Sequence, residues 1–285
     1  IRWINTTTGK NGYSGIEDII ITGEEIPPPP TGILIESTAS GTGSLIHNND
    51  NVEATIQRYI PANAAGNPMF HLVSVPLTED SDPVSGLFMW SYLYKYNNTI
   101  ASPDSPWELM GVSTTNPLEV DQGYMIYKYP GPRAWQTDTV YSFAGPMNNG
   151  SFTCAVTWPD VDNNHNLVPN PYPSPIDWDA SNGWTKTNVY DAIWIWDDAL
   201  GNYAAYGSEA GNNDATSIIP VGQSFFVQTT DPSPDPKPVL AMTNDVRVHN
   251  DQAFYKDTKE DVDLLRLKVA ANDFGDEAVI RFKEE

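Results

Sequence analysis

The sequence lacks any means of forming an internal disulfide, because its 285 residues include a single cysteine, Cys154. Cysteine usage therefore indicates no redox compartment. The residues around Cys154 alternate as in a strand, which predicts a buried and chemically inert thiol. Long apolar runs are also missing. None approaches the roughly 18 residues that a membrane-spanning helix needs, so we expect no membrane insertion.

Basic residues are scarce. The chain has 15 Lys and Arg against 37 Asp and Glu, which gives a formal net charge of -22. This balance argues against nucleic acid as a partner, because a phosphate backbone is bound through Lys and Arg. An acidic surface favours solubility and cation binding and is repelled by anionic membranes. We interpret most of the carboxylates as a solvated face.

Long helical periods are missing too, and 24 prolines with 20 glycines indicate many short elements joined by turns. Hydrophobic residues make up 40% of the chain and aromatic residues 11%. This content is enough to build apolar cores, so a disordered tail is excluded. We predict an all-β fold of tandem β-sandwich or jelly-roll-like units, with short strands and long loops rich in Pro, Gly and Asn.

Catalytic motifs are not recognisable. No HExxH pair, P-loop lysine motif or GxGxxG occurs, and no Gly-x-Ser-x-Gly elbow supports a nucleophilic serine. Asp177 and Asp179 form the most conspicuous carboxylate pair, but residues two apart on a strand share a face in any acidic β chain. We therefore predict no enzymatic activity and interpret both aspartates as partners of nearby turn amides. The four histidines are scattered: His47, His71, His165 and His249.

Composition divides the chain into four segments. Residues 1–24 read as strand, Gly-rich loop and strand, which predicts the closing hairpin of an upstream β-sandwich. Residues 25–32 contain four consecutive prolines and predict a semi-rigid polyproline II linker. Residues 33–158 and 159–285 form a first and a second β-unit, the second ending in the start of a further sheet. Strand-like patterns at both ends lead us to expect a fragment or processed product of a longer chain.

Three pairs of motifs recur about a hundred residues apart and in the same order, which suggests two related β-units. Short aromatic strands that merely look alike are the alternative, because all-β chains reuse the same residue types. The pairs are His71-Leu72-Val73 with Asn166-Leu167-Val168, Tyr94-Lys95-Tyr96 with Trp194-Ile195-Trp196, and Val120–Ile126 with Ile219–Phe225.

The stretch Asn166–Asp179 holds four prolines and occupies the same place in the second unit as His71–Pro76 in the first. Proline removes a backbone donor and fixes φ, which excludes a helix and a central strand. We therefore predict that this stretch is the opening strand and proline brace of the second unit.

Aromatic side chains crowd the second unit. Trp194 and Trp196 share one face of a predicted strand whose other face is also apolar, which favours a buried sandwich strand. Trp178 and Trp184 lie in predicted loops and are the better candidates for exposure. They are the candidate ligand-binding residues, because exposed indole rings stack on sugar rings.

A candidate metal site follows Trp158-Pro159. Asp160, Asp162, Asn163 and Asn164 place four oxygen-bearing side chains in five residues, and calcium takes hard oxygen ligands from flexible loops. The EF-hand pattern is missing, so a solvated loop between the units is the alternative. Calcium is the one cofactor that the sequence suggests.

Eight motifs carry a resemblance to a known family: Gly15–Gly23, Gly41–Ile46, Ile56–Ile60, His71–Pro76, Asn166–Asp179, Ile195–Asp197, Gly222–Val227 and Val246–His249. Their order resembles the β-rich region that precedes the C-terminal sorting domain in secreted surface proteins of Bacteroidetes, exported by the type IX secretion system. The resemblance implies an all-β fold and an extracellular or cell-surface location. It also implies an O-glycosylation motif at Asp138-Thr139-Val140, with Thr139 as the acceptor.

Together these observations predict an extracellular, non-enzymatic structural or adhesive β-module. Its expected partners are other extracellular protein chains or surface glycans. Open strand edges would allow chains to pair into a fibre. The alternative is a carbohydrate-binding accessory module of a secreted hydrolase.

Overall fold

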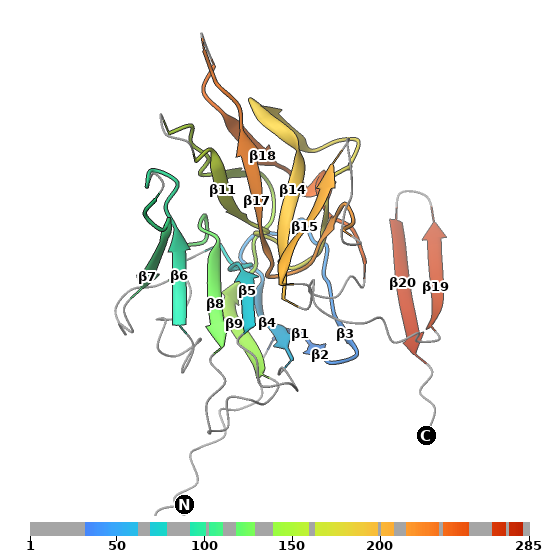
Figure 1. The fold of residues 1–285 in the computed structure, drawn as a ribbon. Coiled ribbons are helices and arrows are strands. Elements are labelled where there is room, and N and C mark those ends of the chain that lie inside the picture. Colours follow the sequence, from blue (N-terminus) through green and yellow to red (C-terminus); the bar gives the residue numbers. More distant parts are fainter. Residues whose placement is uncertain are drawn as a thin grey trace, which may run out of the picture.

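The predicted all-β class is confirmed by the computed structural model. The residues that it describes form strands and one short 3-10 turn, η2 (Asn244–Val246) (Figure 1). None of their helical segments is long and apolar enough to span a bilayer. The described residues are 32–61, 69–78, 92–100, 103–110, 118–128, 139–159, 163–198, 201–207, 215–233, 236–250, 264–271 and 274–281. The predicted segment 1–24 and the predicted linker 25–32, apart from residue 32, lie outside them.

The first half of the described chain forms two stacked sheets. One has the order β1-β4-β9 and the other the order β5-β8-β6-β7, with a small β2-β3 ladder beside the first. The strands are β1 (Ile33–Ile35), β2 (Ser37–Thr38), β3 (Gly41–Thr42), β4 (Glu53–Ile60), β5 (Met69–Val73), β6 (Tyr92–Tyr96), β7 (Trp107–Met110), β8 (Tyr124–Lys128) and β9 (Thr139–Pro146).

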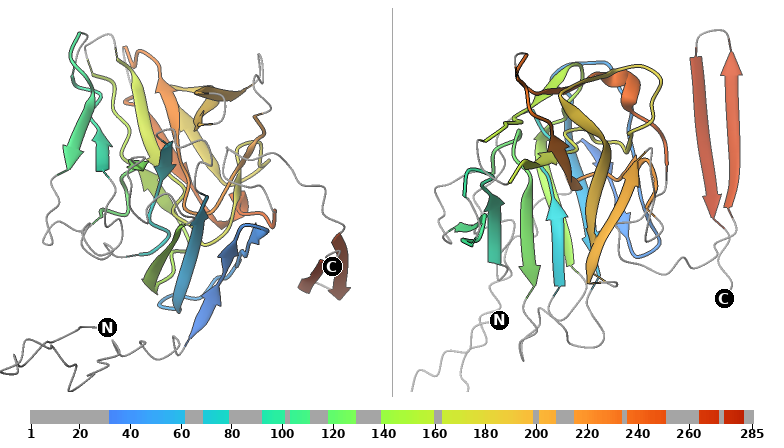
Figure 2. Two further views of the ribbon diagram at one scale, coloured as in Figure 1. Left: turned by 60° about the horizontal axis from the view of Figure 1, so that its bottom comes forward. Right: turned by 45° about the horizontal axis from the view of Figure 1, so that its top comes forward.

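The second half repeats this plan. A sheet of order β10-β18-β13 stacks on a sheet of order β11-β17-β14-β15, with a short β12-β16 ladder. Its strands are β10 (Phe152–Cys154), β11 (His165–Pro169), β12 (Ile176–Asp177), β13 (Trp184–Thr187), β14 (Val189–Asp197), β15 (Asn202–Gly207), β16 (Ile218–Ile219), β17 (Ser224–Thr229) and β18 (Val239–Met242). The hairpin of β19 (Leu264–Ala271) and β20 (Phe274–Arg281) stands apart from this body in all three views (Figures 1 and 2).

Both four-stranded sheets have the same topology, as the repeated motifs predict. If the four strands of each sheet are numbered in chain order, their order across the sheet is first, fourth, second, third. In each repeat a further antiparallel pair, β4 with β9 or β10 with β18, belongs to the other layer. The second repeat thus begins at β10, before the predicted boundary at residue 159. β10 has only three residues, too few for an alternating pattern that would identify β18 as its partner from the sequence.

The strand registers correct one of the predicted correspondences. Val73 lies opposite Tyr124, and its counterpart Val168 lies opposite Phe225. Tyr124 therefore corresponds to Phe225. The motif alignment, which matches Gly123 with Gly222, pairs Tyr124 with Gln223, two positions earlier. The glycines serve different purposes: Gly222 adopts a positive φ of 68° in a turn, whereas Gly123 makes room for a neighbouring strand.

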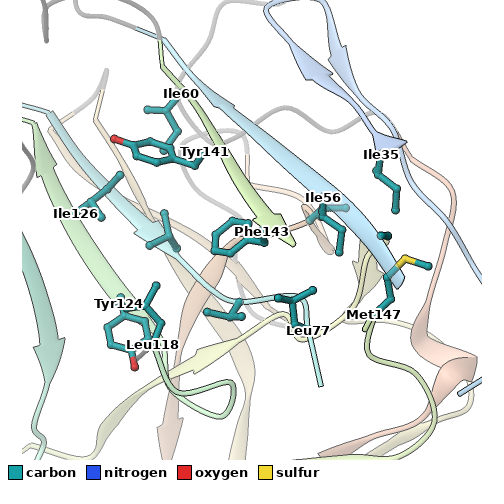
Figure 3. Packing of buried hydrophobic residues seen from close by; sticks show 14 of the residues in the cluster. Ile35, Ile56, Ile60, Leu77, Leu118, Tyr124, Ile126, Tyr141, Phe143 and Met147 are labelled. Carbon is teal, nitrogen blue, oxygen red and sulfur yellow. The ribbon is translucent and has the colours of Figure 1, made fainter. Parts of the chain in front are cut away.

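Each repeat has its own apolar core, and a third cluster lies where the repeats meet. The first core fills the space between the two sheets of the first repeat (Figure 3), and the second core does the same in the second repeat. The third cluster consists of Leu72, Leu167 and Phe226, surrounded by half-buried aromatic side chains from both four-stranded sheets. Two of these three residues are related by the repeat, since Leu72 and Leu167 occupy corresponding positions.

Hydrogen bonds across the junction are reciprocal. Asn98, at the end of β6, donates from Nδ2 to Asn166 Oδ1 at 3.0 Å on β11. Asp198, its counterpart at the end of β14, accepts at Oδ1 from the Phe70 backbone N–H at 2.8 Å on β5. Each repeat thus binds the opening strand of the other through the same loop. Together with the shared apolar cluster, these contacts join the repeats into one body.

Gly123 lies where the backbones of the two repeats approach each other closely. A Cβ added there would lie 2.7 Å from Leu167 Cγ, 2.9 Å from Ser224 Cβ and 3.1 Å from the Leu167 carbonyl oxygen. We expect Gly123→Ala to lower the free energy of unfolding by about 2–4 kcal/mol, because the strands of the second repeat must move. Gly32→Ala is the control, since its Cβ would meet only one atom, at 3.5 Å. Equal urea midpoints for the two variants would contradict this account.

Two histidines make stability depend on pH. Burial lowers the pKa of His47 and of His165, and the positive charge of Arg247 lowers that of His47 further. The folded chain keeps both imidazoles neutral while the unfolded chain takes up protons near pH 6.5, so unfolding becomes easier as the pH falls through about 6.5. We expect a lower Tm at about pH 5.5 than at about pH 7.5, and a smaller difference in the His47→Gln, His165→Gln double variant. An unchanged difference in the double variant would refute the assignment.

Candidate functional site

Aromatic side chains continue beyond the junction on one face of the first repeat. Along β6, Tyr96 packs into the shared cluster, whereas Tyr92 at the other end of the strand is 48% exposed. Leu109 on β7 is 56% exposed and lies opposite Tyr94 on β6. The Tyr92 ring lies 5.9 Å from that of Tyr127 on β8. We call Tyr92, Tyr94, Leu109 and Tyr127 the aromatic face.

A polar cleft lies at the opposite end of β6, where the two repeats meet. Its volume is about 240 Å³. The first repeat contributes the ends of β6, β7 and the turn before β8, and the second contributes the start of β11 and the segment before it. The cleft is lined by Lys95, Tyr96, Asn97, Asn98, Glu108, Gln122, Ala155, Thr157, Asn166 and Leu167.

The floor of this cleft is a closed hydrogen-bond network. Asn98 Nδ2 donates to Thr157 Oγ1 and to Asn166 Oδ1, both at 3.0 Å, and Asn98 Oδ1 accepts from Thr157 Oγ1 at 3.1 Å. Asn166 Nδ2 donates to the carbonyl oxygens of Thr157 and Asn164. Because the amides of Asn98 and Asn166 are committed to one another and to the backbone, they fix the junction and orient the walls.

The rim differs from the buried amides of Asn98 and Asn166 because its side chains are partly exposed. Lys95 Nζ lies 3.3 Å from Glu108 Oε2, and Asn97 Nδ2 donates to Glu108 Oε1 at 3.2 Å. These hydrogen bonds from Asn97 and Lys95 lower the pKa of the Glu108 carboxyl, which is therefore ionised near neutral pH. Gln122 donates from Nε2 to the Gly123 carbonyl oxygen at 2.9 Å. The rim thus presents one balanced ion pair and two carboxamides.

The prediction that Trp178 is exposed is wrong. Its side chain is 1% exposed and lies in the second core. The indole donates from Nε1 to Asp191 Oδ1 at 2.9 Å, and Lys186 Nζ lies 3.6 Å from the ring centroid. The proline-rich stretch folds inward over the core, as the fully buried Tyr172 and Ile176 show. Trp178 therefore offers no free ring face to a sugar.

Trp184 is half-buried on β13 rather than in a loop. Its ring lies 4.9 Å from that of Trp178, and its Nε1 donates to the Asp177 carbonyl oxygen at 2.8 Å. The interpretation of Asp177 is confirmed, since its Oδ1 accepts from the Asp179 backbone N–H at 3.0 Å. Asp179 in turn accepts from the Tyr206 hydroxyl, which raises the pKa of that tyrosine.

The predicted calcium loop is described only in part, since Asp160 and Asp162 lie outside the described residues. Asn163 Oδ1 accepts from the Tyr96 hydroxyl at 2.8 Å, and Asn164 bonds to Gln228 and to the Thr229 carbonyl oxygen. The described residues include no group of three or more His, Cys, Asp and Glu side chains placed to hold a metal ion. Calcium binding stays a prediction.

Two further sequence predictions concern single residues. Cys154 is buried, as predicted, and burial raises the pKa of its thiol well above the ordinary range, which makes it unreactive. Thr139, the predicted glycosylation acceptor, begins β9 opposite Ile60 and is half-buried. Its modification stays a prediction.

Sequence reasoning missed the residues of the cleft rim. Lys95 and Glu108 face each other across β6 and β7, and Gln122 comes from a separate turn before β8. The one available signal was the alternation Tyr94-Lys95-Tyr96, which places a charged side chain between two aromatic ones. Nothing in the sequence indicates which residues of the second repeat complete the cleft.

Comparison with protein families identifies a match over residues 36–269 to DUF8693, a domain of unknown function. The chain belongs to the DUF8693 family. The matched range covers both repeats apart from β1, and it includes the aromatic face and the cleft of this DUF8693 domain. Searches of curated proteins and of solved structures gave no match.

Proposed function

We propose that this DUF8693 domain is a non-enzymatic adhesive module of an extracellular protein, and that it holds neutral surface glycans on the aromatic face. The observation that carries the proposal is the exposure of Tyr92 on β6 and of Leu109 on β7, which lies opposite Tyr94 on the same sheet. Contiguous exposed apolar side chains on a soluble protein mark interaction sites. The extracellular setting rests on the resemblance to type IX secreted surface proteins.

The chemistry of the surface favours a neutral glycan. Tyrosine offers a flat apolar ring with a hydroxyl group, which suits a sugar ring that has one apolar face and polar edges. Strands hold such side chains in a plane at regular spacing. With a net charge of -22, the chain repels acidic polysaccharides and anionic surfaces. The carbohydrate-binding alternative would use the same surface within a larger hydrolase.

The test is retention of the full chain on insoluble neutral polysaccharides, compared with the Tyr92→Ala, Leu109→Ala double variant. We expect retention to weaken by about tenfold or more, since central aromatic contacts typically contribute about 2 kcal/mol. Tyr190→Ala is the matched control, because Tyr190 is 51% exposed but lies on β14 of the second repeat. Equal retention of the double variant and the control would exclude the aromatic face.

A second candidate is assembly into a fibre. β7 is the outermost strand of its sheet, and an edge strand with an exposed apolar side chain such as Leu109 can pair with another chain. If this edge drives assembly, static light scattering should show a mass that rises with concentration. A constant monomer mass would remove this candidate and leave the adhesive proposal intact.

A further inference from the structure

The polar cleft is a separate site from the aromatic face. Its polar groups differ in how much of their hydrogen-bonding capacity is already satisfied. The floor, formed by Asn98, Asn166 and Thr157, is saturated by its own hydrogen bonds. On the rim, Lys95 Nζ contacts Glu108 alone among the described residues, although an ammonium carries three donors. Each Glu108 oxygen accepts one bond from a described residue and has capacity for a second.

Gln122 adds a further acceptor to the rim. Its Nε2 is directed to the Gly123 carbonyl oxygen, while its Oε1 bonds to none of the described residues. Leu167 and Ala155 supply the apolar part of the wall. Spare donors and acceptors therefore converge over a rigid floor, beside a small apolar patch.

We propose that this cleft binds a single neutral, hydroxyl-rich ring, that is, one sugar residue. A charged ligand would lie beside a group of like charge whatever its sign, because Lys95 Nζ and Glu108 Oε2 are only 3.3 Å apart. An apolar ligand would leave the rim groups unpaired. Vicinal hydroxyls donate to the Glu108 carboxylate and accept from Lys95, while the apolar face of the ring lies on Leu167 and Ala155. The volume of about 240 Å³ limits the occupant to a small ligand.

The cleft also explains why the repeats must stay joined. Glu108 and Lys95 come from the first repeat, whereas Leu167 and the Asn166 part of the floor come from the second. Neither repeat contains the site by itself, and small-ligand sites often lie at such boundaries.

The experiment is an NMR titration of the full chain with four neutral monosaccharides, namely glucose, galactose, mannose and N-acetylglucosamine. We expect at least one sugar to shift the side-chain amide signals of Asn97, Asn98, Gln122 and Asn166. The expected dissociation constant is about 1 mM, which a few hydrogen bonds allow. Glu108→Gln keeps the size of the side chain but removes its charge, and should weaken binding by about tenfold. Gln122→Ala should weaken it less.

Glu53→Gln is the control, because it removes an exposed carboxylate on β4, away from the cleft. Shifts confined to the cleft amides and reduced by Glu108→Gln but not by Glu53→Gln establish the site. No shift with any of the four sugars, shifts elsewhere, or equal affinity of Glu108→Gln and the parent chain would overturn it. Tyr92→Ala should leave this titration unchanged, so the cleft and the aromatic face are tested independently.

Discussion

Asn170→Ala is expected to be among the most destabilising single substitutions in this chain. Asn170 is fully buried in the loop after β11. Its Nδ2 donates to the carbonyl oxygens of Ser174, Ile219 and Pro220 at 3.0, 3.3 and 2.9 Å, and its Oδ1 accepts from the Tyr172 N–H at 3.0 Å. Alanine would remove the acceptor of the Tyr172 N–H and the side-chain donor to the three carbonyl oxygens, of which Pro220 would keep the Gln223 N–H. A buried group left unsatisfied costs about 1–3 kcal/mol, so we expect a total loss of about 3–5 kcal/mol.

The measurement is urea unfolding followed by tryptophan fluorescence, for which the chain has nine tryptophans. Asn182→Ala is the matched control, since Asn182 is exposed and its Nδ2 donates only to Ser181 Oγ at 3.3 Å among the described residues. It should change stability by less than about 0.5 kcal/mol. Asn170→Asp separates the two roles of the side chain. It keeps the acceptor for Tyr172 but loses the donors, so it should be at least as harmful as alanine. Recovery of stability by aspartate would show that the three carbonyl bonds contribute little.

Asn170 also explains why the proline-rich stretch folds inward. The prolines remove backbone donors, so the local carbonyl oxygens lack the ladder partners that a strand would supply. The Asn170 carboxamide supplies a donor to the Ser174 carbonyl oxygen of this stretch, and also bonds to the carbonyl oxygens of Ile219 and Pro220 at the end of β16. The Ser74 hydroxyl of the first repeat donates to the Asn170 carbonyl oxygen at 2.8 Å, which carries the network across to the other repeat. The rigid brace predicted from the sequence is therefore held by a buried side chain.

The sequence allowed the repeat, the strands and the edge position of β11 to be predicted. Alternation and proline content depend on local geometry, and β11 does lie at the edge of its sheet. The burial of Trp178 could not be predicted, because a proline-rich loop is polar in its backbone and is expected at the surface. That burial is permitted because Asn170, the Leu45 N–H and the Val248 N–H donate to the loop carbonyl oxygens of Ser174, Pro173 and Pro175. Asp191 accepts from the Trp178 indole N–H.

The cleft could not be predicted for a different reason. Its rim and floor come from segments about 70 residues apart, such as Asn98 and Asn166, and they meet only because the two four-stranded sheets pack together. Repetition of motifs predicts that two units resemble each other but leaves their mutual orientation open. The contacts of Asn98 and Asp198 fix that orientation, and both residues follow the aromatic motifs at the ends of β6 and β14, where they looked like ordinary turn residues.

Arg247 provides the second large effect, because it holds the start and the end of the described body together. Its guanidinium donates from NH2 to the Leu45 carbonyl oxygen at 2.8 Å and from NH1 to the His47 carbonyl oxygen at 2.7 Å. Further bonds reach Ser174 Oγ and Asn244 Oδ1. Burial lowers the pKa of this guanidinium to about 10, so it is still protonated at neutral pH. Its charge is balanced by oxygen dipoles rather than by any carboxylate among the described residues.

We expect Arg247→Met to lower the free energy of unfolding by about 3–5 kcal/mol, because the carbonyl oxygens of Leu45 and His47 lose charge-assisted donors. Arg247→Lys keeps the charge but cannot direct donors to four oxygens from one planar group. It should therefore cost nearly as much, measured by urea unfolding. Lys237→Met is the control, since Lys237 is exposed, and should change stability by less than about 0.5 kcal/mol. A lysine variant as stable as the parent would mean that charge alone, and not the fork of donors, holds residues 45–47 against the second repeat.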